Sequence, residues 1–254
     1  MRKARDNSTH MIIKIISLSI LIVCGVVYSV RKICSADNEV SIPIHSVDTS
    51  DKKLSLSFNT SLEDPSSNIE QLLDVLDKHN AKATFFVTGQ WVDKNKELVN
   101  EISKRGHELG NYSDTHTNPA HISDESIIEE IQSAKTKIKE VTNVDTVLYR
   151  PPYSDVNEDV IRICDSLDHT VVKWDIDSLD WKQIGHTHIV DRVNKSINSG
   201  SIVLFHTSEN GIAKYVDEIL TNLSEDEYEV ITISDLLYDN NYIVDEYGKQ
   251  KETD

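Results

Sequence analysis

The sequence is poor in glycine, proline and cysteine, and each shortage excludes a class of protein. Eight Gly and five Pro make up about 5% of 254 residues, too few for a collagen-like or Pro-rich low-complexity chain. Three cysteines exclude a disulfide-dense scaffold. Basic residues are also scarce after the first 36 positions, since residues 37–254 hold 20 basic and 42 acidic side chains, a formal charge of −22. No nucleic-acid partner is therefore expected, because phosphates are held by clustered Lys and Arg.

The longest apolar run lies near the N-terminus. Residues 15–30 carry no charge, and the run extends to 20 residues at 11–30 if Lys14 reaches the lipid headgroups. A helix of that length is about 30 Å long, the thickness of one bilayer core. Basic residues precede the run, which predicts a cytoplasmic segment at 1–10, a transmembrane signal anchor at 11–30 and an exported remainder. The expected location is the cell membrane, with the domain outside the cytoplasm and the membrane itself as one partner.

Three alternatives to a permanent anchor remain open at this stage. A signal peptide cleaved near 34–36 is one, although Arg31 and Lys32 lie between the apolar run and that site. Lipidation of Cys24 and a buried core helix are the others.

The body of the chain alternates short β-type runs with helical runs. Residues 31–51 indicate a polar linker, 52–238 the domain, and 239–254 a loose charged tail. Seven strands are expected, at Leu54–Phe58, Ala83–Val87, Glu108–Tyr112, Thr146–Tyr149, Thr170–Trp174, Ser201–Phe205 and Glu229–Ile233. Strands that alternate with helices are typical of a parallel α/β sheet, open or closed into a barrel.

The helical runs carry their own signals. Apolar residues keep helical spacing over 69–76 and 127–141, and Ser66, Ser123 and Asn157 are suited to cap helices. The only cysteine of the body lies in the helical-looking run Val160–Cys164. We expect it to be a small buried hydrophobic residue rather than a nucleophile.

Residues able to do chemistry follow several of the expected strands. In parallel α/β folds such residues gather at the carboxyl ends of the strands. The rim so defined collects His116, Arg150, Asp180, Trp181 and His206. A His beside a carboxylate can act as a general acid or base, an Arg can hold an oxyanion, and a Trp offers a flat face to a sugar ring.

These rim segments, in this order, resemble the polysaccharide deacetylase family, the NodB homology domain of carbohydrate esterase family four. The resemblance extends over about Leu54–Leu237 and is most similar to the sporulation-type wall deacetylases of Gram-positive bacteria. The best-matching segments are Ala83–Gly89, Arg105–Asn111, Arg150–Tyr153 and Leu204–His206. The resemblance implies an irregular seven-stranded (β/α) barrel and hydrolysis of N-acetyl groups on a cell-wall or surface glycan.

The resemblance also implies roles for individual residues. Members of the family hold a divalent metal, usually zinc, with one Asp and two His, and use a second Asp as general base. On the acid side of the site, His206 corresponds to the general acid, Asp180 to its carboxylate partner and Arg150 to the arginine that supports the base. The residues that correspond to the substrate groove are Tyr153, Trp181 and Leu204.

The metal side departs from the family pattern. Asn59 stands at the base position, and Thr60 and Tyr112 stand at two of the three metal-ligand positions, which leaves His116 alone. A catalytic zinc site needs three protein ligands, so zinc is expected to bind weakly or not at all. Loss of a general base alone costs on the order of 10²–10⁴ in rate. We therefore expect deacetylation to be impaired or absent.

Two other functions remain open. One is a non-catalytic protein that binds a glycan or a protein partner through the groove formed by Tyr153, Trp181 and Leu204. The other is an active enzyme with a relocated metal, for which Glu63, Asp64, Asp114, His116 and His121 are the nearest candidate ligands. A further pair, His186 and His188, is expected to be solvated on the surface.

Overall fold

The structure, a computed structural model, describes residues 42–60 and 65–253. The expected signal anchor at 11–30 and most of the expected linker lie outside these ranges, as do Glu63 and Asp64. Within the described ranges no helix has both the length and the apolar character needed to cross a membrane.

The centre of the fold is a curled parallel sheet built around β2 (Lys53–Asn59). Its strands run in the order β6-β5-β4-β3-β2-β8-β7, and β9 pairs with the beginning of β2. The other strands of this sheet are β3 (Thr84–Val87), β4 (Glu108–Asn111), β5 (Leu148–Tyr149), β6 (Thr170–Val171), β7 (Ile176–Asp177), β8 (Ile202–His206) and β9 (Glu229–Val230). The predicted parallel α/β sheet is confirmed, and each of the seven expected strands is present in part.

The irregular seven-stranded barrel that the family resemblance implied is present as a curled half-barrel. Its two edge strands, β6 and β7, do not pair with each other in the described part of the chain. They are instead consecutive: the segment 170–177 pairs first with β5 and then, after four residues, with β8. The expected strand Thr170–Trp174 is therefore split, because the chain leaves one edge of the sheet and joins the other.

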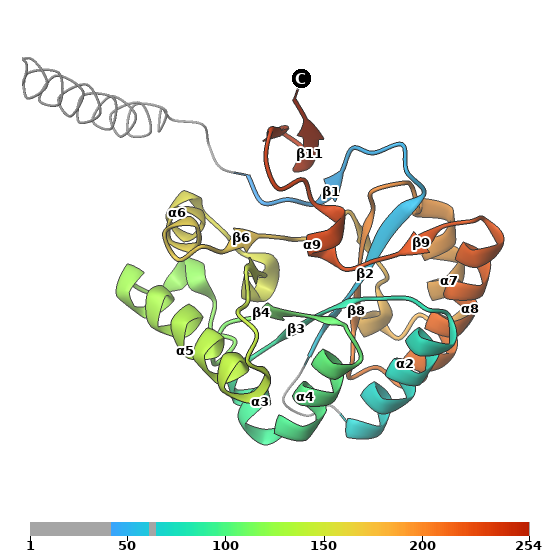
Figure 1. Cartoon of the computed structure of the whole chain (residues 1–254), viewed down its shortest axis with the longest axis horizontal. Coiled ribbons are helices and arrows are strands. Elements are labelled where there is room, and N and C mark those ends of the chain that lie inside the picture. The colour runs from blue at the N-terminus through green and yellow to red at the C-terminus, as the bar shows by residue number, and fades with distance from the viewer. Residues whose placement is uncertain (1–41, 61–64, 254) are drawn as a thin grey trace, which may run out of the picture. The chain divides into compact units, whose positions relative to one another are not determined.

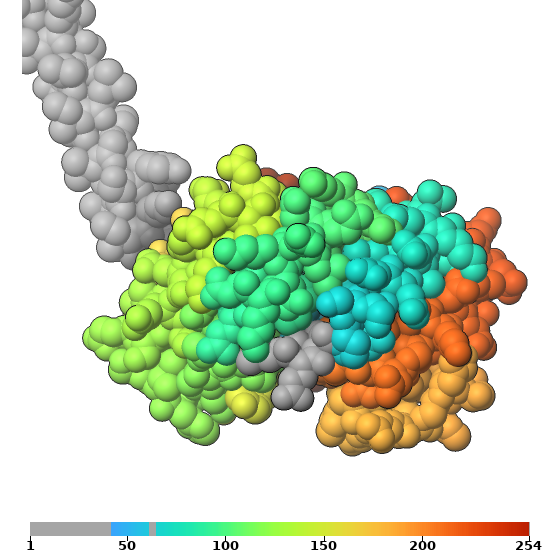
Figure 2. All heavy atoms as spheres, turned by 90° about the horizontal axis from the view of Figure 1, so that it is seen from below, coloured from blue at the N-terminus to red at the C-terminus, as the bar shows by residue number. Residues whose placement is uncertain are grey.

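Helices cover the outside of this sheet, and neighbouring helices follow one another around it from α6 through α5, α4, α2 and α8 to α7 (Figure 1). Figure 2 shows the face on which α2 lies between α4 and α8. The helices are α2 (Ser66–Lys78), α3 (Gly89–Lys94), α4 (Lys96–Lys104), α5 (Asp124–Thr142), α6 (Glu158–Ser166), α7 (His186–Ser196), α8 (Ile212–Glu225) and α9 (Ile233–Leu236). Single 3₁₀ turns occur at Pro119–His121, Pro152–Ser154 and Asp180–Lys182.

Two of the three predicted caps are confirmed. The side chains of Ser123 and Asn157 accept backbone N–H groups at the starts of α5 and α6. Ser66 is instead the first helical residue of α2, after Pro65, and makes no cap of this kind. Cys164 is buried on α6, and burial raises the pKa of its thiol to about 12, so the prediction of an inert hydrophobic residue is confirmed.

Aromatic rings join the sheet to α8 inside the core. Phe58 of β2 stacks on Phe85 of β3 and on Phe205 of β8, with ring centroids 5.0 and 5.6 Å apart. Phe205 in turn stacks on Tyr215 of α8 at 5.9 Å. This row fixes α8 against the carboxyl end of β8, where the predicted site lies.

The segment 239–254, expected to be a loose tail, is ordered over most of its length. Strands β10 (Tyr242–Val244) and β11 (Lys249–Glu252) form an antiparallel hairpin, and β11 pairs in parallel with β1 (Ser46–Val47). The side chain of Gln250 is buried and exchanges hydrogen bonds with both backbone groups of Tyr238. The segment is ordered because this buried amide and the β1 ladder tie it to the domain.

The same small sheet shows where the chain enters the domain. The backbone N–H of Val47 donates to the carbonyl of Gly200, and Ser46 bridges to Ser201, next to the amino end of β8. Residues 44–47, expected to belong to a linker, are therefore part of the fold.

Candidate functional site

The carboxyl ends of β2, β4, β5 and β8 bring the predicted rim residues together. Asn59 ends β2, and its partners in register are Phe86 on β3 and His206 on β8. Tyr112 follows β4 directly, and Arg150 follows β5, where its backbone N–H donates to the carbonyl of Asn111. Residues that are far apart in sequence thus share one end of the half-barrel, as the parallel topology predicts.

The acid side of the site is a buried carboxylate–imidazole pair. Asp180 is 1% exposed, and its Oδ1 accepts from Nδ1 of His206 at 2.8 Å and from the backbone N–H of Trp181 at 2.8 Å. Its Oδ2 accepts from the backbone N–H of His206 at 2.7 Å. These bonds fix the ring orientation of His206 and keep its proton on Nδ1, the arrangement in which a carboxylate orients an acid–base imidazole.

Tyr215 supports this pair, and the sequence did not indicate it. Its hydroxyl donates to Oδ2 of Asp180 at 3.3 Å from the first turn of α8. Burial, followed by the nearby Asp180 carboxylate, raises the pKa of the Tyr215 phenol, so the hydroxyl stays a donor. Tyr215 occupies an ordinary apolar position of an amphipathic helix, so no pattern distinguishes it from a core residue.

On the opposite side, a neutral hydrogen-bonded group fills the base and metal positions. Nδ2 of Asn59 donates to Oη of Tyr112 at 3.0 Å, and Oδ1 of Asn59 accepts from Nη1 of Arg150 at 3.0 Å. Burial raises the pKa of the Tyr112 phenol to about 12, so Tyr112 carries no charge near neutral pH. Both the NH₂ and the oxygen of the Asn59 amide form hydrogen bonds within the protein. The amide also has no basic lone pair that could take a proton from a water molecule.

Arg150 is fully buried without a carboxylate partner among the described residues. Its guanidinium donates to Asn59 and to the carbonyls of Val172 and Lys173, and its centre lies 3.9 Å from the ring of Phe86. Burial lowers the pKa of this group to about 9. Because Val172 and Lys173 lie where the chain crosses between the two sheet edges, Arg150 also satisfies carbonyls at the open side of the half-barrel.

The donors at the metal positions do not fit zinc. Thr60 is neutral and its buried hydroxyl has no hydrogen-bond partner, while Tyr112 is a protonated phenol engaged by Asn59. Only His116 offers an imidazole, and burial, with a smaller contribution from His206, lowers its pKa. Within residues 42–60 and 65–253 no group of three or more His, Cys, Asp or Glu side chains is placed to hold a metal ion. One imidazole and two neutral hydroxyls cannot replace a carboxylate and two imidazoles.

The candidate ligands for a relocated metal that lie in the described ranges are either paired with other side chains or exposed on the surface. Oδ1 of Asp114 accepts from Nζ of Lys137 at 2.8 Å, so its charge is already paired. His121 ends an exposed 3₁₀ turn. His186 and His188 lie in the first turn of α7, where Nε2 of His186 is 2.6 Å from Glu218 on α8. His186 is thus an exposed surface residue hydrogen-bonded to a carboxylate.

The predicted groove residues differ in accessibility. Tyr153 is 68% exposed and Trp181 is 49% exposed, so both rings present open surface beside the site. Nζ of Lys182 lies 4.9 Å from the centre of the Trp181 ring. Leu204 is only 2% exposed within β8, so it lies beneath the groove rather than on its surface.

Glu130, on α5, anchors the loop that follows β4 and was not singled out from the sequence. Its Oε2 accepts from the hydroxyl of Ser113 and from the backbone N–H groups of Asp114 and Thr115. These hydrogen bonds outweigh burial and lower the pKa of Glu130, so the carboxylate is charged at neutral pH. Glu130 lies four residues before the buried Ala134, on the same side of α5, so an acidic residue at this spacing was the signal in the sequence that could have singled it out.

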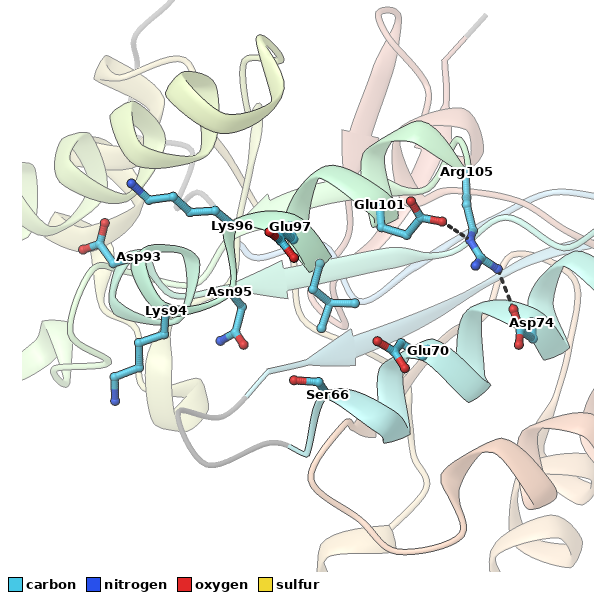
Figure 3. Close-up of a pocket in the computed structure, with 11 residues that line it drawn as sticks. Ser66, Glu70, Asp74, Asp93, Lys94, Asn95, Lys96, Glu97, Glu101 and Arg105 are labelled. Atoms are coloured by element: carbon cyan, nitrogen blue, oxygen red, sulfur yellow. Dashed lines mark hydrogen bonds and ion pairs between the residues drawn. The ribbon is translucent and has the colours of Figure 1, made fainter.

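A separate polar groove lies between α2 and α4 (Figure 3). Arg105 crosses it, donating to Asp74 on α2 and to Glu101 on α4. The other lining residues are Ser66, Glu70, Asp93, Lys94, Asn95, Lys96, Glu97 and Leu98. None of them corresponds to a residue of the predicted site, and the charges of both signs indicate a solvated surface held by ion pairs.

Comparison with known proteins agrees with this geometry. The sequence pattern of the polysaccharide deacetylase family matches residues 46–172. The peptidoglycan-N-acetylmuramic acid deacetylase PdaA of Bacillus subtilis is 31% identical over 195 residues, which cover 75% of this chain and 73% of PdaA.

Solved structures resemble this one in fold. A CE4 family pseudoenzyme from Bacillus anthracis superposes with a TM-score of 0.74 at 27% identity, over 86% of this chain and 74% of that one. A mutant of the same protein with restored enzymatic activity gives a TM-score of 0.74 at 30% identity, over 79% and 72% of the two chains. The fold, the carboxylate–imidazole pair and the relatives together establish that this chain belongs to the polysaccharide deacetylase family.

Proposed function

We propose that this chain is a membrane-anchored, extracytoplasmic member of the family that binds an N-acetylated cell-wall glycan and has impaired deacetylase activity. The single observation that carries the proposal is the pair of neutral side chains, Asn59 and Tyr112, at the base position and at a metal position, hydrogen-bonded to each other and to Arg150. The anchor at 11–30 is proposed from the apolar run and its basic flank alone.

The loss of activity follows from the chemistry of these side chains. A base must accept a proton from water, and the amide of Asn59 does not do so near neutral pH. A metal would polarise the acetyl carbonyl and activate the attacking water, and Thr60 and Tyr112 are poor ligands for it. His206 and Asp180 still form an acid–base pair. An acid that protonates the leaving amine does not help, however, unless water has first attacked the acetyl carbonyl.

Glycan binding is supported by two features that remain. The exposed rings of Tyr153 and Trp181 flank the site and offer apolar faces to sugar rings. Relatives of this chain are named for acting on peptidoglycan that carries N-acetyl sugars, PdaA among them. These two features therefore favour a non-catalytic protein that binds such a glycan.

Two measurements on the full chain test the proposal. We expect no zinc binding in calorimetry up to millimolar zinc and no acetate release from N-acetylated peptidoglycan fragments. Zinc binding below micromolar concentration at one site, with acetate release, would support an active enzyme with a relocated metal. In that case the variants Asp64→Ala and His121→Ala would abolish the release.

A restoring variant provides the matched control. Asn59→Asp, Thr60→Asp and Tyr112→His together return the family's residues to the three changed positions. We expect this triple variant to bind zinc and to regain acetate release, while His206→Ala in the same background loses the release. If the triple variant does not bind zinc, the loss of zinc binding has causes beyond these three side chains.

A further inference from the structure

His116, the remaining family metal ligand, sits within a column of aromatic rings. The centre of its imidazole lies 4.7 Å from the ring of Tyr112, with an angle of 80° between the planes. On its other side the ring of Tyr153 lies 5.0 Å away at 60°. These are edge-to-face contacts within the favourable range for aromatic pairs. The column therefore runs from a buried phenol through a half-buried imidazole to an exposed phenol.

The backbone that holds these rings is unusual for residues other than glycine. Ser113 and His116 have φ angles of 71° and 63°, and Tyr153 and Ser154 have 59° and 58°. Left-handed conformations are unfavourable for such residues and persist where surrounding contacts hold them. Two loops, one after β4 and one after β5, are thus both fixed in conformations that depend on their neighbours.

Specific contacts hold the two loops and join them. Glu130 binds the loop of Ser113 through three backbone and side-chain donors, as described above. Nδ2 of Asn118 donates to Oδ2 of Asp155 at 3.0 Å, which links the first loop to the second. Nζ of Lys173 donates to the carbonyl of Ser154 at 3.2 Å. These hydrogen bonds, together with the His116 imidazole against which it packs, set the position of the exposed Tyr153 ring.

We propose that His116 acts in this chain as an aromatic positioning residue that holds Tyr153 as a stacking surface for a pyranose ring of an N-acetylated glycan. The inference rests on the proposed glycan-binding function and deepens it. Glu130 is the second positioning residue, because it holds the loop that presents His116. In this arrangement the imidazole contributes its flat ring rather than a metal-binding lone pair.

The experiment measures affinity for a defined probe, the β-1,4-linked tetramer of N-acetylglucosamine, by calorimetry with the full chain. We expect His116→Ala to weaken binding about fivefold to tenfold and His116→Phe to stay within about twofold of the unchanged protein, because a phenyl ring preserves the edge-to-face contacts. Glu130→Gln should weaken binding about threefold through the loop. The exposed His188→Ala on α7 is the control and should leave the affinity unchanged.

A double-variant comparison separates positioning from general damage. If His116 acts through Tyr153, His116→Ala adds little once Tyr153→Ala is present. Additive losses, or a His116→Phe variant as weak as His116→Ala, would overturn the inference.

Zinc provides a second and independent readout. A stacking role predicts that neither 1 mM zinc nor a chelator changes the affinity of the unchanged protein for the tetramer, whereas a retained ligand role predicts a zinc effect that His116→Ala removes. If the unchanged protein binds the tetramer but its affinity is insensitive to His116→Ala, the inference alone fails. If the unchanged protein does not bind the tetramer at all, the proposed glycan-binding function fails, and the inference with it.

Discussion

At the scale of single residues, an amide in place of a carboxylate changes the electrostatics of the site without changing its shape. Asn59 is nearly isosteric with Asp and keeps its hydrogen bonds to Tyr112 and Arg150. The consequence falls on Arg150, which is buried as a cation among carbonyls, an amide and the ring of Phe86. A carboxylate at position 59 would accept from both neighbours, with the Tyr112 hydroxyl turned to donate.

The first prediction is that Asn59→Asp stabilises the protein. Hydrogen bonds to charged groups contribute about 1.5–3 kcal/mol, against about 1 kcal/mol for neutral pairs, and the new carboxylate would face an unpaired cation 3.0 Å away. Allowing for the cost of burying the carboxylate, we expect the free energy of unfolding at pH 7 to rise by about 1 kcal/mol. Urea denaturation measures it, with the exposed Asn240→Asp as control. A lower stability for Asn59→Asp than for the control would contradict this account of Arg150.

A second prediction concerns pH and rests on His107. Burial lowers the pKa of this imidazole to about 4, from 6.5 in an unfolded chain, and its Nε2 has no hydrogen-bond partner. Between these values the unfolded state binds the proton and the folded state does not, so stability is full above pH 6.5 and falls as the pH drops toward 4. The free energy of unfolding that is lost as the pH falls from 6.5 to 4 is on the order of 3 kcal/mol.

Thermal unfolding between pH 7.5 and 4.5 checks this prediction. The variant His107→Phe keeps a ring against Phe85 but cannot titrate, so its melting temperature should fall less steeply over this range. Equal slopes for the two proteins would assign the pH dependence to other groups.

At the scale of elements, the strands with strong β-type residues were predictable and the shortest ones were not. β3 and β8 each carry a run of apolar or β-branched residues, and β2 alternates apolar residues with serine; all three were expected from the sequence. β4, which reads Glu-Leu-Gly-Asn, was expected as well. β7 has two residues and no period of its own, β10 is a largely exposed run of only three residues, and β11 consists mainly of charged residues. Their order comes from pairing with distant parts of the chain, which local sequence does not encode.

The same limit applies to the site. Motif residues at strand ends, such as Asp180 and His206, were predictable because parallel topology brings those ends together. Tyr215 and Glu130 reach the site from two covering helices, α8 and α5, outside the strand-end motifs that the sequence analysis examined. The contact between His116 and Tyr153 depends on two left-handed loop conformations that no sequence pattern indicated.

The third prediction tests how closely β3 and β4 pack. A Cβ added at Gly110 would lie 2.5 Å from the ring of Phe86, which is fully buried and packs against Arg150. Gly110→Ala should therefore lower the free energy of unfolding by about 1–3 kcal/mol. In the double variant with Phe86→Leu, the loss should be smaller than the sum of the two single losses, since the smaller side chain frees the space. Strict additivity would mean that the alanine is accommodated elsewhere.

At the scale of the whole molecule, the terminal hairpin completes the domain. β11 pairs with β1, and Gln250 is buried against Tyr238. The chain's first strand thus depends on its last one, which links the two ends of the described domain in a single folding unit.

The fourth prediction follows from this dependence. Ending the chain after Tyr238 would leave β1 without β11 and expose the apolar residues around Val47, so we expect the melting temperature to fall by at least about 5 °C, which corresponds to the loss of about 2 kcal/mol. Ending it after Thr253 keeps every described residue of the hairpin and serves as the control. An unchanged melting temperature in the shorter protein would show that the hairpin contributes little to stability.

The point where the chain enters the domain has a consequence for access. Val47 and Ser46 contact Gly200 and Ser201 at the amino end of β8, whereas His206 ends that strand at the site. Five residues of extended strand, about 17 Å, separate the two ends. A sugar chain bound at the mouth of the half-barrel, as we propose, would therefore lie at the opposite end of β8 from Ser46 and Val47, so β1 itself would not limit how far that chain extends.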